Sequence, residues 1–226
     1  MNLTEQREGI EAGRLDMFVD GAFAFTLTLL VIGGDVVPHD STKLLEALGG
    51  IPAFAACFAQ IAMFWHGHVR WRQQCLDSDR AGRWLSLLLV FFALIFIYPL
   101  HMVFSSLFHG ISDWFPSTFE ASSAADMRTL FVCYGLSFAC MAGTLVLLFR
   151  HAARLAAAES RASFEAWREV LLWSVPTLVG LVSVAVALLL PLSAPSGWWG
   201  VPGFVYFLMA SIGPLMRWFR RRHGLA

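Results

Sequence analysis

Six long apolar segments determine most of what this chain of 226 residues can fold into. They cover residues 17–36, 50–69, 84–108, 129–149, 170–192 and 200–218. A helix rises ~1.5 Å per residue, so about 20 apolar residues cross the hydrocarbon layer of a bilayer. The composition agrees, because 58% of the residues are hydrophobic, 14% are charged and the mean hydropathy is +0.64, which is far more apolar than a soluble domain. The sequence predicts an all-α, polytopic membrane protein with six transmembrane helices.

The positions of the basic residues predict the orientation of these helices. If the N-terminus is cytoplasmic, fourteen of the sixteen Lys and Arg residues lie in cytoplasmic segments, and Lys43 and Arg128 alone lie outside. Cytoplasmic loops of membrane proteins carry such an excess of positive charge. We therefore expect both termini in the cytoplasm and a multi-pass protein of the cell membrane. The cluster Arg220–Arg222 is expected to meet anionic lipid headgroups, and basic residues at membrane edges give no indication of nucleic-acid binding.

The domain organisation is simple. No gap between the segments is long enough for a soluble domain, and no internal repeat is visible, so we expect residues 1–226 to form a single six-helix transmembrane domain. The acidic N-terminus lacks the basic region of a signal peptide, so the first segment should be retained. Cys133 and Cys140 are seven residues apart on one helix, about 10 Å along its axis, which is beyond disulfide reach. We expect reduced cysteines.

One carboxylate lies where the first apolar segment begins. Asp20 enters the segment that continues to Ile32, and a carboxylate in hydrocarbon is costly enough to indicate function. Trp65 and His68 lie near the end of the second segment, which returns to the same side, so their depth should match that of Asp20. Because a buried charge needs partners, we expect hydrogen bonds to join Arg14, Asp20, Trp65 and His68. Alternatively, Trp65 and His68 are interfacial anchors.

A stripe of side chains shares one face of the first segment. Steps of three and four residues connect Phe18, Gly21, Phe25, Thr28, Ile32 and Asp35. Gly21 permits a close approach of helices, and the Thr28 hydroxyl can contact a passing ion. Ordinary packing between helices is the alternative explanation of this stripe.

Two motifs carry a family resemblance: Arg-x-x-x-Phe-x-Asp-Gly, formed by Arg14, Phe18, Asp20 and Gly21, and Trp-x-x-His, formed by Trp65 and His68. With these motifs the chain resembles the transmembrane-protein-175-like cation channels, which are known from lysosomes and bacteria. The stretch 84–92 and Pro99 match less specifically. The resemblance covers the first half of the chain, while the later segments match only in length and hydrophobicity.

The resemblance implies a potassium-permeable homotetramer, in which four copies of the first helix line the pore. It implies neither a cofactor nor enzymatic activity. By position, Phe25 falls at the hydrophobic constriction, Thr28 at the threonine layer beside it and Ile32 at the next apolar layer. Asp35 near the outer mouth would form a ring of four carboxylates, and such a ring concentrates cations.

The resemblance also implies a structural hydrogen-bond network that positions the first helix. Its members here are Arg14, Phe18, Asp20, Trp65, His68 and Ser86. The chain departs from the family pattern at three positions. Val19 replaces a serine of the network, Phe25 is bulkier than the usual constriction residue, and Ser86 stands where many members have asparagine.

Functions other than a channel have weaker support in the sequence. A proton-coupled or proton-conducting transporter is the main alternative, since Asp20 and His68 are residue types used in proton relays, although no inverted repeat is visible. A haem carrier needs paired axial ligands. His66 and His68 point to different sides of their helix, and His101 lacks an evident partner. The sequence contains neither a Gly-x-Ser-x-Gly nor a His-Glu-x-x-His motif of a hydrolase.

Overall fold

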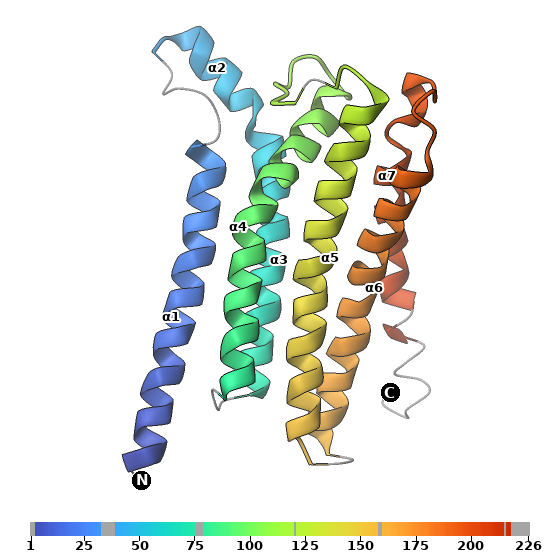
Figure 1. The fold of residues 1–226 in the computed structure, drawn as a ribbon. Coiled ribbons are helices and arrows are strands. Elements are labelled where there is room, and N and C mark those ends of the chain that lie inside the picture. The colour runs from blue at the N-terminus through green and yellow to red at the C-terminus, as the bar shows by residue number, and fades with distance from the viewer. Residues whose placement is uncertain are drawn as a thin grey trace.

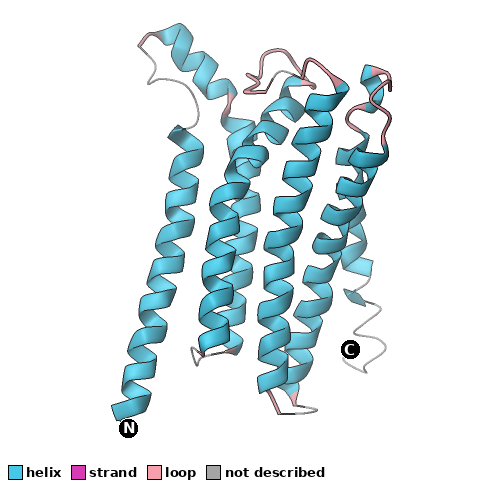
Figure 2. Cartoon of the chain, viewed as in Figure 1, coloured by secondary structure: helices cyan, strands magenta, loops and turns pink. Residues whose placement is uncertain are grey.

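The computed structural model describes residues 3–32, 39–75, 79–119, 121–157, 160–214 and 216–217. These residues contain helices and loops and no strand (Figure 2), which confirms the predicted all-α class. The elements are α1 (Leu3–Ile32), α2 (Ser41–Gly49), α3 (Ile51–Gln74), α4 (Arg80–His109), α5 (Ala124–Leu155), α6 (Arg161–Leu189), η1 (Ser196–Trp198), α7 (Val201–Phe204) and η2 (Val205–Ser211).

The long helices α1, α3, α4, α5 and α6 run side by side in alternating directions (Figure 1). We call the end where α1, α4 and α6 begin the basal end, and the end where α3 and α5 begin the distal end. α1 lies at one edge of the bundle, where it contacts α3 and α4, and the segment from α7 to η2 packs on α6 at the other edge. This alternation places Arg70, Arg80, Arg150 and Arg168 at the basal end, whereas Lys43 and Arg128 lie at the distal end.

Long helices cover four of the six predicted membrane segments. α4, α5 and α6 are each long and apolar enough to cross a membrane, and α2 with α3 passes the same test as one span bent by 42°. The described part of α1 does not meet this criterion. The described residues of 200–218 begin with a short α-helix and a 3₁₀ helix instead of one long α-helix. The six-span topology and the orientation therefore stay predictions.

Polar caps begin the helices at the positions where the chain turns. Asp40 accepts a hydrogen bond from the Lys43 amide at 2.8 Å and starts α2, a helix that the sequence analysis placed in a connection. Asp79 caps α4 through the Gly82 amide at 3.0 Å. Ser123 and Ser160 cap α5 and α6 in the same way. Each cap satisfies one of the amides that a helix start leaves without a partner.

The core between α3, α4, α5 and α6 contains a cluster of aromatic rings. The Phe64 ring meets the rings of Phe96, Phe138 and Trp173 at centroid distances of 5.5–6.1 Å, within the range that favours aromatic pairs. Phe64, Phe96 and Phe138 are fully buried. All four cysteines are free, as the sequence predicted. This core forms the rigid surface against which α1 packs.

Gly67 on α3 makes room for this core. A Cβ atom at position 67 would lie 2.5 Å from the Trp173 ring and 2.8 Å from Leu145 Cδ1, which is closer than any real contact allows. The absence of a side chain therefore lets the Trp173 indole stack on Phe64 next to the α3 backbone.

We expect Gly67→Ala to destabilise the fold, because overpacking a well-filled core typically costs about 1–3 kcal/mol. Gly143→Ala is the matched control, since a Cβ at position 143 meets only Thr177 Cγ2 at an ordinary 3.7 Å. Alanine also favours helix over glycine by ~1 kcal/mol, so the control should be neutral or stabilising. Thermal unfolding of both variants in the same detergent measures the difference. Equal midpoints for the two would show that Trp173 shifts without cost.

Candidate functional site

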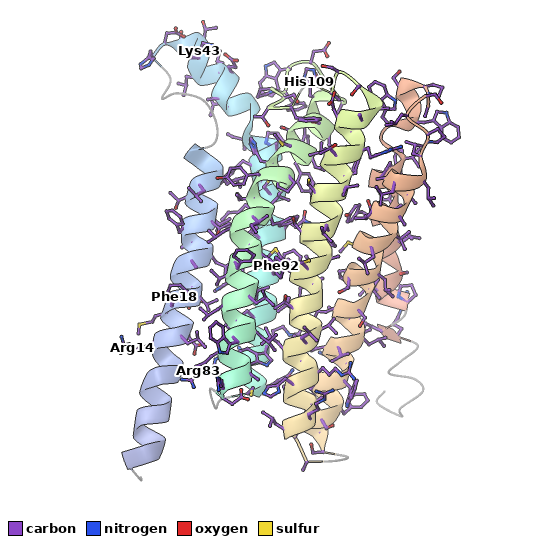
Figure 3. All side chains as sticks on the ribbon, in the orientation of Figure 1. Arg14, Phe18, Lys43, Arg83, Phe92 and His109 are labelled. Carbon is purple, nitrogen blue, oxygen red and sulfur yellow. The ribbon has the colours of Figure 1, made fainter. Side chains whose placement is uncertain are left out.

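α1 has two different faces. Val19, Phe23, Thr26 and Leu30 are buried against the bundle, at most 4% exposed. The opposite face carries Met17, Phe18, Gly21, Phe25 and Thr28, all of them exposed. Figure 3 shows Arg14 on the side of α1 that is turned away from α4. The helical spacing predicted this outward stripe, and the structure places Phe18, Gly21, Phe25 and Thr28 on it.

The two outward residues at the centre of α1 differ in chemistry. Phe25 is 56% exposed and presents an apolar ring. Thr28, one turn further, donates its hydroxyl to the Ala24 carbonyl at 3.0 Å, which uses its only proton. The lone pairs of the Thr28 oxygen therefore remain available on the outward face. An apolar ring beside an exposed oxygen acceptor is an arrangement suited to a desolvated or partly hydrated cation.

Asp20 contacts the bundle through one hydrogen bond. Trp65 Nε1 on α3 donates to Asp20 Oδ1 at 2.8 Å, so the structure brings these two predicted residues together. The Asp20 side chain is exposed and Trp65 is 39% exposed. The bond thus lies at the boundary between the two faces of α1.

A second anchor lies one turn nearer the basal end, and sequence reasoning missed it. Arg72 Nε donates to Asp16 Oδ1 at 2.7 Å and Arg72 Nη2 donates to Asp16 Oδ2 at 3.2 Å. Arg72 Nη1 also donates to the Cys75 carbonyl at 2.6 Å, which fixes the guanidinium. The signal was present, because Asp16 precedes Asp20 by four residues and Arg72 follows Trp65 by seven, so each pair shares one face of its helix.

The remaining predicted partners lie elsewhere. His68 is 2% exposed, and its Nε2 is 2.9 Å from the Ser86 hydroxyl on α4, which is fully buried. Hydrogen bonds thus pair Asp20 with Trp65 and His68 with Ser86, and among the described contacts none joins the two pairs. Arg14 is exposed and has no described hydrogen bond to either pair. The buried Val19 packs in the core instead of supplying a hydroxyl.

The structure does not describe the side chains of two residues that the sequence predicts along the pore. Asp35 lies outside the described residues, and the side chain of Ile32 is likewise not described. The described residues contain no group of three or more His, Cys, Asp or Glu that could hold a metal ion.

At the basal end, Asp79 links α4 to α5. Its Oδ1 caps the Gly82 amide, and its Oδ2 is 2.8 Å from Nε2 of His151. Burial raises the pKa of Asp79, but the Gly82 amide and the His151 ring lower it by more, so that the pKa lies below its ordinary value. Asp79 is therefore a carboxylate that the folded state holds ionised.

Comparisons with known proteins show what the part of the chain that forms this site is similar to. Residues 14–99 match the family model described as endosomal/lysosomal potassium channel TMEM175, a range that contains α1 from Arg14 onward, all of α3 and both anchors. A protein of Marivirga tractuosa named potassium channel is 26% identical over 224 residues, which cover 90% of this chain and 85% of that protein. A potassium channel of Chamaesiphon minutus is 29% identical over 117 residues, 47% of this chain and 56% of that protein.

Two solved structures share the fold. A variant of the potassium channel MtTMEM175, crystallised with a nanobody-MBP fusion protein, superposes with a TM-score of 0.76 at 24% identity, over 94% of each chain. A homolog of the lysosomal potassium-selective channel TMEM175, from Chamaesiphon minutus, gives a TM-score of 0.60 at 23% identity, over 91% of this chain and 98% of that one. The resemblance predicted from the sequence is thereby confirmed.

The bond between Asp20 and Trp65 can be tested with a double-mutant cycle. Asp20→Ala removes the acceptor, and Trp65→Phe removes only the indole N–H. A hydrogen bond to a charged group contributes about 1.5–3 kcal/mol when buried, and exposure here should reduce the coupling to about 0.5–1 kcal/mol. The measurement is the unfolding free energy of the four proteins in detergent. Asp16→Ala combined with Trp65→Phe is the control and should show no coupling, because Asp16 pairs with Arg72.

The Asp79 link predicts a change in acid stability. A carboxylate whose pKa is lowered by folding stabilises the protein above its unfolded pKa of about 3.9, and this contribution is lost as the pH falls through the folded pKa. Asp79→Asn keeps the cap but removes the titration, so its stability should fall less between neutral pH and pH values below about 4. Asp113→Asn, in an exposed loop, should unfold in acid like the wild type. Parallel acid curves for the wild type and Asp79→Asn would contradict the prediction.

Proposed function

We propose that this TMEM175-like chain forms a potassium-permeable cation channel of the cell membrane. In this proposal four copies assemble as a homotetramer, and the outward faces of their α1 helices line the pore. The curated relatives and the solved structures that resemble the chain are named potassium channels, which supports potassium as the permeating ion. Monovalent cations of similar size are the class of ions to compare with it.

The observation that carries the proposal is the mixed character of the outward face of α1. It carries exposed Gly21 and Thr28 beside the exposed rings of Phe18 and Phe25, and exposed Asp20 lies at its boundary. A face with a carboxylate and a hydroxyl is unfavourable against lipid, whereas it suits water or another subunit.

The proposed tetramer follows from the need for several such α1 faces around one path. One α1 cannot enclose a path, and the chain supplies only one Arg-x-x-x-Phe-x-Asp-Gly motif. α1 lies at the edge of the bundle (Figure 1), so its outward face is open to neighbouring copies. Four copies around a common axis would bring four Phe25 rings and four Thr28 hydroxyls together.

Phe25 is the residue proposed for the narrowest point of the pore. Four rings would form a hydrophobic constriction, and such constrictions control conduction by resisting wetting. The Thr28 oxygens, one turn away, would receive the ion as it leaves its water shell. Ile32 and Asp35 would continue the lining toward the distal end. Arg14, Asp20, Trp65, His68 and Ser86 would position α1 and its neighbours without touching the ion.

Phe25→Ala tests the constriction. In liposomes that hold purified protein, this variant should carry a larger potassium current and discriminate less between potassium and sodium, because a wider and wetter neck passes partly hydrated ions. Phe91→Ala is the matched control, since Phe91 on α4 is also 56% exposed but lies outside the proposed pore. It should conduct like the wild type. Unchanged permeation in Phe25→Ala would mean that Phe25 is a packing residue and that the pore runs elsewhere.

Thr28→Val tests the role of the Thr28 oxygen, and native mass spectrometry tests the proposed tetramer. Valine has the same shape without the oxygen, so the potassium current should fall without any widening of the neck. The intact protein should appear as a tetramer in native mass spectra, and spectra that contain only monomers would overturn the channel. A proton-coupled transporter would instead show saturating flux that follows the pH gradient, with no unitary currents in any variant.

A further inference from the structure

A small hollow lies at the distal end of the bundle, far from α1. It is formed where α5 begins and α6 ends, and Ala124, Arg128, Leu190 and Trp199 are among its lining residues. It comprises about 220 Å³ of space between atoms, including its open mouth.

Arg128 is held in this hollow by the end of α6. Its Nη2 donates to the carbonyl of Leu190, the residue that ends α6. Cations are favourable at such helix ends, so this contact alone explains part of the position of Arg128. However, a helix end carries only about half a negative charge, which leaves the guanidinium with net positive charge.

The second nitrogen of interest is Arg128 Nε. It is buried, and it has no hydrogen-bond partner among the described residues. Nor does any described carboxylate form an ion pair with Arg128. Asp126, two residues away, accepts hydrogen bonds from the Ser122 amide and the Ser123 hydroxyl instead. A guanidinium that is held at one nitrogen and has a buried, unused donor favours an anionic oxygen acceptor.

The surroundings of the hollow suit a lipid. Leu189 is 81% exposed, Leu192 56% and Trp198 59%, so apolar surface flanks the hollow on the α6 side. The Trp199 indole donates to the Ala194 carbonyl at 2.9 Å, which fixes one wall. Tryptophan rings are typical of the depth at which lipid headgroups lie. A phosphate at the mouth would therefore have acyl chains that continue over the exposed leucines.

We propose that Arg128 and the hollow beside it form a phosphate-binding site, and that an anionic phospholipid of the surrounding membrane supplies the phosphate. The guanidinium contacts the phosphate through Nε and its free edge, in the planar geometry that arginine offers to such groups. The site is separate from the proposed pore, and it requires only that the bundle spans a membrane.

The test compares lipids by their effect on thermal stability. The purified full chain in dodecyl maltoside is heated with added phosphatidylglycerol, phosphatidylcholine or inorganic phosphate. We expect phosphatidylglycerol to raise the unfolding midpoint of the wild type by several degrees more than phosphatidylcholine does. Inorganic phosphate should have no effect. If inorganic phosphate reproduces the whole shift, the assignment to a lipid is wrong.

Ala124→Glu is the most informative variant. Residue 124 begins α5 and lies four residues before Arg128, so a glutamate there can pair with the guanidinium and is favoured by the helix start. The variant should fold at least as well as the wild type and lose its preference for phosphatidylglycerol. Ala124→Gln, without the charge, should keep the preference. Equal preferences in Ala124→Glu and the wild type would overturn the proposal.

Removal of the charge completes the test. Arg128→Gln should also lose the preference, judged against its own midpoint in phosphatidylcholine so that a weaker end of α6 does not obscure the result. Lys43→Gln removes the other distal cation and should keep the preference. Glu120 lies outside the described residues, so Glu120→Gln is included. A preference that only this variant shows would mean that a carboxylate of the chain occupies the site, which overturns the proposal.

Discussion

The position of α1 depends on the ion pair between Asp16 and Arg72. This pair is bidentate, and the side chains are 36% and 12% exposed respectively, so it is better shielded than a typical surface pair. One turn later, the bond from Trp65 to Asp20 repeats the connection between the same two helices. Both bonds lie near the middle of α1. The described distal half is held by apolar contacts of residues such as Phe23 and Leu30.

These anchors can position α1 only because the surface that carries them is rigid. Arg72 and Trp65 both belong to α3, whose opposite side enters the aromatic core through Phe64. Gly67, between them in sequence, brings α3 close enough for the Trp173 indole to stack there. The core and the anchors are therefore coupled along one helix, and a change in the core is expected to move the anchors of α1.

The sequence predicted the parts of the fold that depend on long apolar runs, and less of the parts that depend on single contacts. The segments 50–69, 84–108, 129–149 and 170–192 correspond to α3, α4, α5 and α6, because burial of apolar side chains dominates in each. α2 was missed because its nine residues are too short for a periodic signal. The region after Gly200 is apolar enough for a span, but its described residues begin with a short α-helix that continues as a 3₁₀ helix.

The spacing of residues along one helix predicted which of them share a face. It predicted less well which residues of other helices they contact. Phe25 and Thr28 point outward as the three-residue step between them indicates, because this step is a local property of the helix. Whether His68 meets Asp20 or Ser86 depends on the rotation of α3 relative to α1 and α4, which no single sequence contains. The pairing of Asp16 with Arg72 belongs to the same class of contacts, and both residues lie just outside the apolar segments.

The anchors also fix the rotation of α1, which decides what its outward face presents. Successive residues of a helix are about 100° apart, so a slip by one residue that replaced Phe25 by Thr26 on the outward face would also replace Val19 by Asp20 on the buried face. Asp16 and Asp20 are four residues apart and lie along the boundary of the buried face, where two directional bonds oppose such a rotation. Thr26 donates its hydroxyl to the Ala22 carbonyl at 2.8 Å and is fully buried, so the inward face is satisfied in the present rotation. Asp16 and Asp20 therefore select which apolar residues the outward face of α1 presents.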